Sequence, residues 1–146
     1  MVKPGRHPVS ASIELRHLEA THDRKRGMPL RPLILVVEDD DDIRILIADF
    51  LQDCAYRVAS ANERGLGTDI MRATRPSLVV ADVNLRDGNG DDLSALARAM
   101  DIPILLISGE PKTIERHQGD VAEFLQKPFR LADLHAKIKE MIVCRP

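Results

Sequence analysis

The stretch ADVNLRDGNGDD (81–92) is rich in acidic and amide side chains that could bind a metal ion or take part in catalysis. Asp87, Asn89 and Asp91 occupy the first, third and fifth positions of an EF-hand calcium loop. That loop also needs Gly at its sixth position and Glu at its twelfth, where this chain has Asp92 and an arginine. The calcium interpretation therefore fails, and these residues are expected to form a loop that ends near the N-cap of a helix.

Asp82 differs from its neighbours because it directly follows the apolar run SLVVA (77–81), which is typical of a buried strand. Open α/β sheets form their ligand sites at the carboxyl ends of strands. Carboxylates that converge there would repel one another unless a cation neutralises them, and Mg²⁺ prefers such hard oxygen ligands. Four further polar residues stand at the ends of other apolar runs: Glu38, Asp39, Ser108 and Lys127.

The elements that must position these residues alternate along the chain. Near-continuous apolar strands separated by helical stripes predict an α/β fold, a doubly wound five-stranded parallel sheet with helices on both faces. The second helix is expected to be weak, because Gly65 and Gly67 interrupt it. Strands are predicted at 33–37, 56–61, 77–81, 103–108 and 122–126, and helical stripes at 43–51, 63–72, 93–100 and 131–142.

The composition is that of one ordinary globular domain of 146 residues, with no signal-peptide core or membrane span, and we expect it in the cytoplasm. Residues 1–32 hold seven Lys or Arg against three acidic residues, which predicts a flexible basic N-terminal extension before a domain at 33–146. A start of translation at Met28 stays open. The extension has no aromatic residue, so nucleic-acid binding is not expected. Cys54 is predicted half-buried at a helix end, and the five histidines at the surface.

Four segments resemble, in the same order, the receiver domain of two-component response regulators, the CheY-like family. They are LVVEDDDDIR, PSLVVADVNLRDGNG, PILLISG and FLQKPFRLADL, and the resemblance covers the chain from Leu33 to about Val143. It implies a flavodoxin-like sheet with strand order 2-1-3-4-5 and five helices. The fourth helix is expected to be short, because only 18 residues separate Ser108 from Lys127.

The resemblance also implies roles for the residues at the strand ends. Asp82 would be the phosphoacceptor, phosphorylated by a sensor histidine kinase or a histidine phosphotransfer protein. Asp39, Asp82 and the backbone carbonyl of Asn84 would bind Mg²⁺ directly, and Glu38 would do so through water. Lys127 would hold the phosphoryl oxygens, and a cis bond to the following proline is expected.

Signal output would depend on a second group of residues. The resemblance implies that Ser108 donates a hydrogen bond to the phosphoryl group and that Phe124 is the switch aromatic. The first helix, with an exposed face around Arg44, and the loop after Phe129 would contact the kinase. Because the chain stops at Pro146, just after the last helix, we expect a stand-alone response regulator that signals by protein contact to a downstream target.

Two alternatives stay open. A Mg²⁺-dependent phosphatase with an aspartyl nucleophile would normally carry a second Asp two residues after the first, where this chain has Asn84. A receiver-like scaffold would not turn over phosphate at all. Otherwise the chain is not expected to be an enzyme beyond transfer to, and loss of phosphate from, its own aspartate. The sequence does not decide between a monomer and a dimer formed on phosphorylation.

Overall fold

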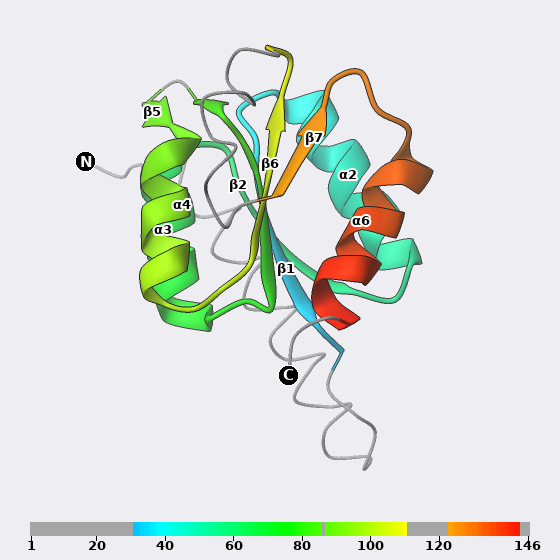
Figure 1. Cartoon of the computed structure of the whole chain (residues 1–146), viewed down its shortest axis with the longest axis horizontal. Coiled ribbons are helices and arrows are strands. Elements are labelled where there is room, and N and C mark those ends of the chain that lie inside the picture. Colours follow the sequence, from blue (N-terminus) through cyan, green and yellow to red (C-terminus); the bar gives the residue numbers. More distant parts are fainter. Residues whose placement is uncertain (1–30, 86, 111–122, 144–146) are drawn as a thin grey trace, which may run out of the picture.

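The five predicted strands form one sheet in which all strands are parallel (Figure 1). The strands are β1 (Leu33–Val37), β2 (Arg57–Ala61), β3 (Leu78–Asp82), β6 (Ile104–Ser108) and β7 (Glu123–Gln126). The computed structural model describes residues 31–85, 87–110 and 123–143. The strand order β2-β1-β3-β6-β7 confirms the predicted order 2-1-3-4-5 when the strands of this sheet are counted along the chain.

The helices of the described residues cover both faces of the sheet. They are α2 (Asp41–Asp53), α3 (Arg64–Thr74), α4 (Gly90–Ala99) and α6 (Leu131–Val143). Helices α3 and α4 lie on one face and α2 and α6 on the other (Figure 1). Within the described part of the chain, every helix is too short or too polar to cross a membrane. Most of the short helix predicted between Ser108 and Lys127 falls on residues 111–122, and most of the extension predicted at 1–32 falls on residues 1–30; both ranges lie outside the described residues.

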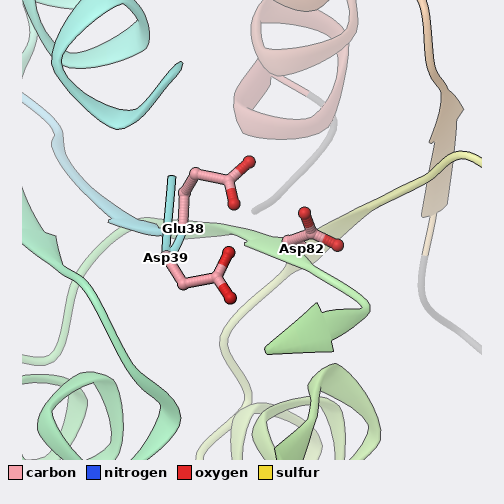
Figure 2. Close-up of side chains that lie close together, drawn as sticks. All are labelled: Glu38, Asp39 and Asp82. Atoms are coloured by element: carbon pink, nitrogen blue, oxygen red, sulfur yellow. The ribbon is translucent and has the colours of Figure 1, made fainter. Parts of the chain in front are cut away.

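The chain adds β2 on one side of β1 and all later strands of this sheet on the other side. The order of the strands therefore reverses at β1. The register pairs Val37 with Ala81. The residues that follow this pair, Glu38 and Asp82, therefore lie at the same edge of the sheet (Figure 2). Ligand sites of open α/β sheets form at such a switch point.

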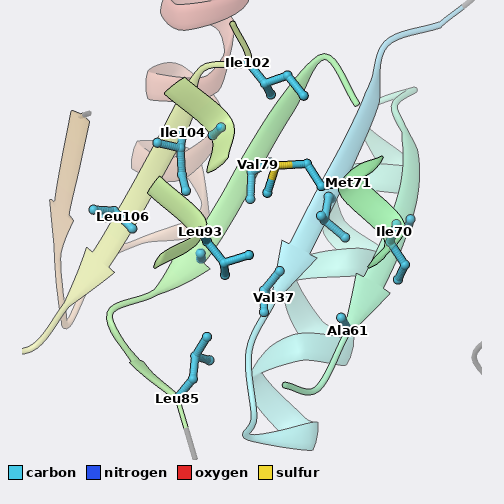
Figure 3. Close-up of a cluster of buried hydrophobic side chains, with 14 of the residues drawn as sticks. Val37, Ala61, Ile70, Met71, Val79, Leu85, Leu93, Ile102, Ile104 and Leu106 are labelled. Atoms are coloured by element: carbon cyan, nitrogen blue, oxygen red, sulfur yellow. The ribbon is translucent and has the colours of Figure 1, made fainter. Parts of the chain in front are cut away.

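The side chains of β1 alternate between two apolar clusters, because successive residues of a strand point to opposite faces. Leu35 and Val37 belong to the cluster with residues of α3 and α4 (Figure 3), and Ile34 and Val36 to the cluster with residues of α2 and α6. All residues of β1, β3 and β6 are buried. This explains why these runs show continuous apolar character rather than a period of two.

The segment after β3, predicted as a loop, holds a small antiparallel hairpin. Its strands are β4 (Asn84–Leu85) and β5 (Gly88–Asn89). Leu85 is buried in the cluster that faces α3 and α4. Helix α4 begins at Gly90, so Asp91, predicted at the end of a loop near the N-cap, lies in the first turn of the helix. Strands of two residues are too short to leave a periodic pattern in the sequence.

The carboxyl end of α2 contacts α6 through aromatic rings and a thiol. The ring of His135 lies edge-on to the rings of Phe50 and Tyr56, with centroids 6.0 and 5.8 Å away. The Sγ atom of Cys54, the half-buried C-cap residue of α2, lies 3.7 Å from Nδ1 of His135. The position predicted for Cys54 is confirmed, but His135 is half-buried rather than at the surface.

Helix α3 is continuous from Arg64 to Thr74 despite its two glycines. Gly67 is buried, and a Cβ atom there would lie 2.9 Å from Cγ2 of Val37 and 3.6 Å from Cδ2 of Leu93. The absence of a side chain therefore lets α3 approach β1 closely. The expectation that these glycines interrupt the helix was wrong, because close packing against the sheet outweighs the low helix propensity of Gly.

Replacing Gly67 with Ala should lower the free energy of unfolding by about 1–2 kcal/mol, because the cost of overpacking against Val37 exceeds the gain in helix propensity. Gly65→Ala is the matched control in the same helix, since its Cβ would lie 3.5 Å from Asp87 Oδ2, an ordinary contact. That variant should be neutral or more stable by up to about 1 kcal/mol. Urea denaturation measures both; similar shifts in the two variants would contradict the packing explanation.

Candidate functional site

Three carboxylates meet at the carboxyl edge of the sheet, where β1 and β3 lie side by side (Figure 2). One oxygen from each of Glu38, Asp39 and Asp82 lies within 4.8 Å of the others. Glu38 and Asp39 directly follow β1, and Asp82 is the last residue of β3. The structure thus brings together the acidic residues that the strand ends predicted.

The next three aspartates in the sequence serve the start of α2 instead. Asp40 is the N-cap residue, and its Oδ1 accepts a hydrogen bond from the backbone N–H of Ile43 at 3.1 Å. Asp41 and Asp42 are exposed in the first turn, where carboxylates interact favourably with the helix dipole. The acidic run therefore divides into a pair at the strand end and three residues that begin the helix.

The site carries more negative charge than its own residues neutralise. The side chain of Glu38 is only 4% exposed and that of Asp82 only 9%. Burial and the charge of Asp82 raise the pKa of Glu38 from 4.5 to about 7, although the charge of Lys127 and a hydrogen bond from the backbone of Asp40 act in the opposite direction. Hard oxygen donors with surplus negative charge fit the predicted Mg²⁺ ion.

Lys127 enters the same site from the end of β7. Its Nζ donates hydrogen bonds to Oδ2 of Asp82 at 2.7 Å and to Oε1 of Glu38 at 3.3 Å. Burial tends to lower the pKa of Lys127, but the hydrogen bond and charge of Asp82, followed by those of Glu38, raise it above its usual value. The Lys127–Pro128 peptide bond is cis, as predicted. The lysine therefore lies protonated against the carboxylates.

The carboxylate of Asp82 is held from both sides. Oδ2 accepts from Lys127, and Oδ1 accepts from the backbone N–H of Asn84 at 2.8 Å. Asn84, whose side chain is exposed, is the first residue of β4. The hairpin after β3 therefore contributes directly to the orientation of Asp82, while the predicted role of the Asn84 carbonyl as a metal ligand stays a prediction.

Ser108 and Phe124 lie on the two strands beyond β3. Ser108 is fully buried, and its hydroxyl accepts from the backbone N–H of Glu110 at 3.0 Å and donates to the Glu110 carbonyl at 3.2 Å. Phe124 is half-buried in β7 and packs against the cluster that faces α3 and α4. The hydroxyl predicted to bind a phosphoryl group is thus engaged by its own loop.

The predicted exposed face around Arg44 requires correction. The side chain of Arg44 is only 16% exposed, because its guanidinium donates to the Glu38 carbonyl at 3.0 Å and contacts Asp41 at 2.6 Å. The two residues that follow it, the apolar Ile45 and Leu46, are 53% and 57% exposed. Arg44 therefore holds the loop after β1, and the exposed surface on either side of it includes both acidic and apolar side chains.

Sequence reasoning missed the function of Asp87, which it assigned only to a loop. The Asp87 carboxylate accepts hydrogen bonds from the first two backbone N–H groups of α3, those of Arg64 at 2.7 Å and Gly65 at 2.9 Å. Desolvation tends to raise the pKa of this exposed carboxyl, but these hydrogen bonds outweigh it and lower the pKa. One signal was available, since Glu63, the N-cap residue, makes no side-chain cap and is a poor capping residue.

Comparison with known proteins finds a family model, described as the response regulator receiver domain, that matches residues 34–139. The chain is similar to the regulatory protein VirG of Agrobacterium tumefaciens, with 29% identity over 152 aligned residues that cover 100% of this chain and 55% of VirG. It is also similar to the transcriptional regulatory protein PrrA of Mycobacterium tuberculosis, with 31% identity over 119 residues that cover 76% of this chain and 50% of PrrA. The chain spans about half the length of these relatives.

Among solved structures, the non-phosphorylated HemR receiver domain of Leptospira biflexa is similar with a TM-score of 0.72 and 31% sequence identity. The match covers 80% of this chain and 98% of the HemR chain.

Without divalent cations, the free energy of unfolding should fall as the pH rises from about 4.5 to about 7. Folded Glu38 keeps its proton up to about pH 7, whereas unfolded Glu38 loses it near 4.5. The folded state therefore binds more protons in this window and loses about 2–3 kcal/mol of stability across it. Urea denaturation in a chelator across this range measures the slope. Glu38→Gln should flatten the slope, and Glu140→Gln, on the exposed face of α6, should keep it.

Proposed function

Because the chain belongs to the family of response regulator receiver domains, we propose that it accepts a phosphoryl group on Asp82 in a Mg²⁺-dependent reaction. The single observation that supports this proposal most is the environment of Asp82. Its buried carboxylate lies beside two further carboxylates and 2.7 Å from a lysine Nζ. A carboxylate is ionised near neutral pH and needs no general base to attack phosphorus.

In the proposed reaction, an oxygen of Asp82 forms a bond to phosphorus while the bond from phosphorus to the donor atom breaks. In a phosphohistidine donor, that atom is an imidazole nitrogen. Phosphoryl transfer depends mainly on position and on charge stabilisation. The N–H of Asn84 fixes one oxygen of Asp82, and Lys127 lies at the other oxygen, where it would also hold oxygens of the incoming phosphoryl group.

The acidic residues are proposed to hold the metal ion. Asp39, Asp82 and the backbone carbonyl of Asn84 would bind Mg²⁺ directly, and Glu38 would do so through water. When bound, Mg²⁺ neutralises the carboxylates and the phosphoryl oxygens. The convergence of three carboxylates around one lysine supports this assignment, because a divalent cation would offset the remaining negative charge.

Signal output is proposed to start at Ser108. Its hydroxyl would leave the backbone of Glu110 and donate to the phosphoryl group, and Phe124 would then repack against the space behind it. Phe124 has no hydroxyl, so this response changes packing rather than hydrogen bonding. The signal would pass to a downstream protein by contact.

The proposed phosphodonor is a sensor histidine kinase or a histidine phosphotransfer protein. Ile45 and Leu46, exposed on α2 beside the loop that holds Glu38, support a docking surface for the donor here, together with the loop after Phe129. We further propose a cytoplasmic location, a receiver domain at 33–146 behind a basic extension at 1–32, and no catalysis beyond the reactions of its own aspartate.

Asp82→Asn should abolish phosphorylation. Intact mass after incubation with a small acyl phosphate should show one added phosphoryl group on the wild type only when Mg²⁺ is present. Asp49→Asn, which changes an exposed carboxylate of α2, should be phosphorylated like the wild type. A wild type that binds Mg²⁺ but accepts phosphate from no small donor or phosphohistidine protein would favour the scaffold alternative. Hydrolysis of simple phosphate monoesters, which the proposed transfer from acyl phosphates or phosphohistidine would not use, would favour the phosphatase.

Lys127→Ala should slow phosphoryl transfer by about 100-fold or more, because one preorganised cation is lost at the developing charge. Its affinity for Mg²⁺ should not fall, since the variant removes a positive charge that competes for the same carboxylates. Lys137→Ala is the matched control. The Nζ of Lys137 pairs with Glu123 at 3.4 Å, and Glu123 begins β7, at the opposite end of that strand from Lys127. Transfer at the wild-type rate in Lys127→Ala would remove this lysine from the mechanism.

A further inference from the structure

The hairpin that follows Asp82 is tied to the beginning of α3 through one side chain. Both carboxylate oxygens of Asp87 accept backbone N–H groups of this helix, Oδ1 from Arg64 and Oδ2 from Gly65. The Arg64 guanidinium donates back to the Asp87 carbonyl at 3.3 and 3.4 Å. Because both oxygens are used and the arginine returns to the same residue, the position and the orientation of Asp87 are fixed.

We propose that Asp87 is a positioning residue that fixes the backbone of Asn84 beside Asp82 and thereby sets the affinity of the site for Mg²⁺. This inference rests on the proposed function, because it concerns the metal that phosphoryl transfer would need. The Asp87 carboxylate contacts Arg64 and Gly65 of α3 rather than the carboxylates of the site, so it would act through the hairpin.

The contact between Asp87 and α3 would influence Asn84 and Asp82 through the short segment that connects them to Asp87. Asp82 is fixed in β3, which pairs with strands on both sides. Between this anchor and Asp87, Leu85 is buried and Asn84 has an exposed side chain. Asn84 is therefore placed by its backbone, through its N–H to Asp82 and its pairing with Asn89 in the hairpin.

Without the Asp87 carboxylate, the tip of the hairpin would lose its two hydrogen bonds to the backbone N–H groups of α3. The two residues that follow, Gly88 and Asn89, belong to a strand of only two residues, and a Gly restricts the backbone little. Leu85 would keep the hairpin near the core but would not fix its rotation. The backbone of Asn84 would then sample more positions, and groups that orient a metal ligand typically change affinity by about 10–100-fold when removed.

The test uses the full chain with Mg²⁺ alone as the probe. Titration calorimetry measures the Mg²⁺ dissociation constant, and amide hydrogen exchange in the metal-free protein follows the N–H of Asn84. Asp87→Ala should weaken Mg²⁺ binding by about 3–10-fold, below the range for direct partners of ligands because Asp87 acts at a distance. The same variant should speed exchange of the Asn84 N–H several-fold, and Asp87→Asn, which keeps one acceptor oxygen, should fall between it and the wild type.

Asp92→Ala is the matched control. Asp92 is an exposed aspartate that pairs with the same Arg64 at 3.6 Å, so this variant removes an equal charge nearby without touching the hairpin contact. It should leave the Mg²⁺ affinity within about 2-fold, and an equal loss in both variants would reduce the effect to long-range electrostatics.

The outcomes separate this inference from the proposed function. If Asp87 only caps α3, Asp87→Ala will lower the thermal midpoint while the Mg²⁺ affinity and the exchange of Asn84 stay at wild-type values, and the inference is overturned. If the wild type itself binds no Mg²⁺, the proposed function fails first. Asp87→Asn keeps the question answerable should Asp87→Ala not fold.

Discussion

The parallel pairing of β1 with β3 is the constraint on which the rest of the structure depends. Its register sets Val37 opposite Ala81, so the following residues, Glu38 and Asp82, must share one buried edge. Like charges removed from water there are costly. The arrangement persists because each central strand is buried in apolar packing on both faces of the sheet. Lys127, which follows the edge strand β7, then offsets part of this negative charge. It thereby connects the edge strand to the site at β1 and β3.

Most of the fold could be predicted because its signals are local and long enough. Strands of four or five residues, three of them almost wholly apolar, and helices of ten or more residues leave a clear pattern, and their alternation leaves few topologies. The failures concern interactions between distant residues. Gly67 looks like a helix breaker until β1 is known to lie against it. The hairpin of Asn84–Leu85 with Gly88–Asn89 is too short for any periodicity, and His135 is half-buried only because α2 packs on α6.

The candidate site could be located from the sequence, but not its hydrogen bonds. The strand ends indicated Glu38, Asp39 and Asp82, because parallel strands bring their carboxyl ends to one edge. They did not indicate that the Ser108 hydroxyl would be engaged by the backbone two residues later. Nor did they predict the Asp87 carboxylate at the start of a helix more than twenty positions earlier, since sequence pattern carries no information on such pairings.

The contact between α2 and α6 has a consequence for spectroscopy. The chain contains no tryptophan and a single tyrosine, Tyr56, which directly precedes β2 at the edge of the sheet opposite the carboxylates. Its ring lies edge-on to His135, within 5.8 Å between centroids. The tyrosine absorption and fluorescence of the folded domain therefore report on the contact between these two helices. Ligand binding at the acidic edge would therefore change the tyrosine signal only if its structural effect reached this contact at the opposite end of the strands.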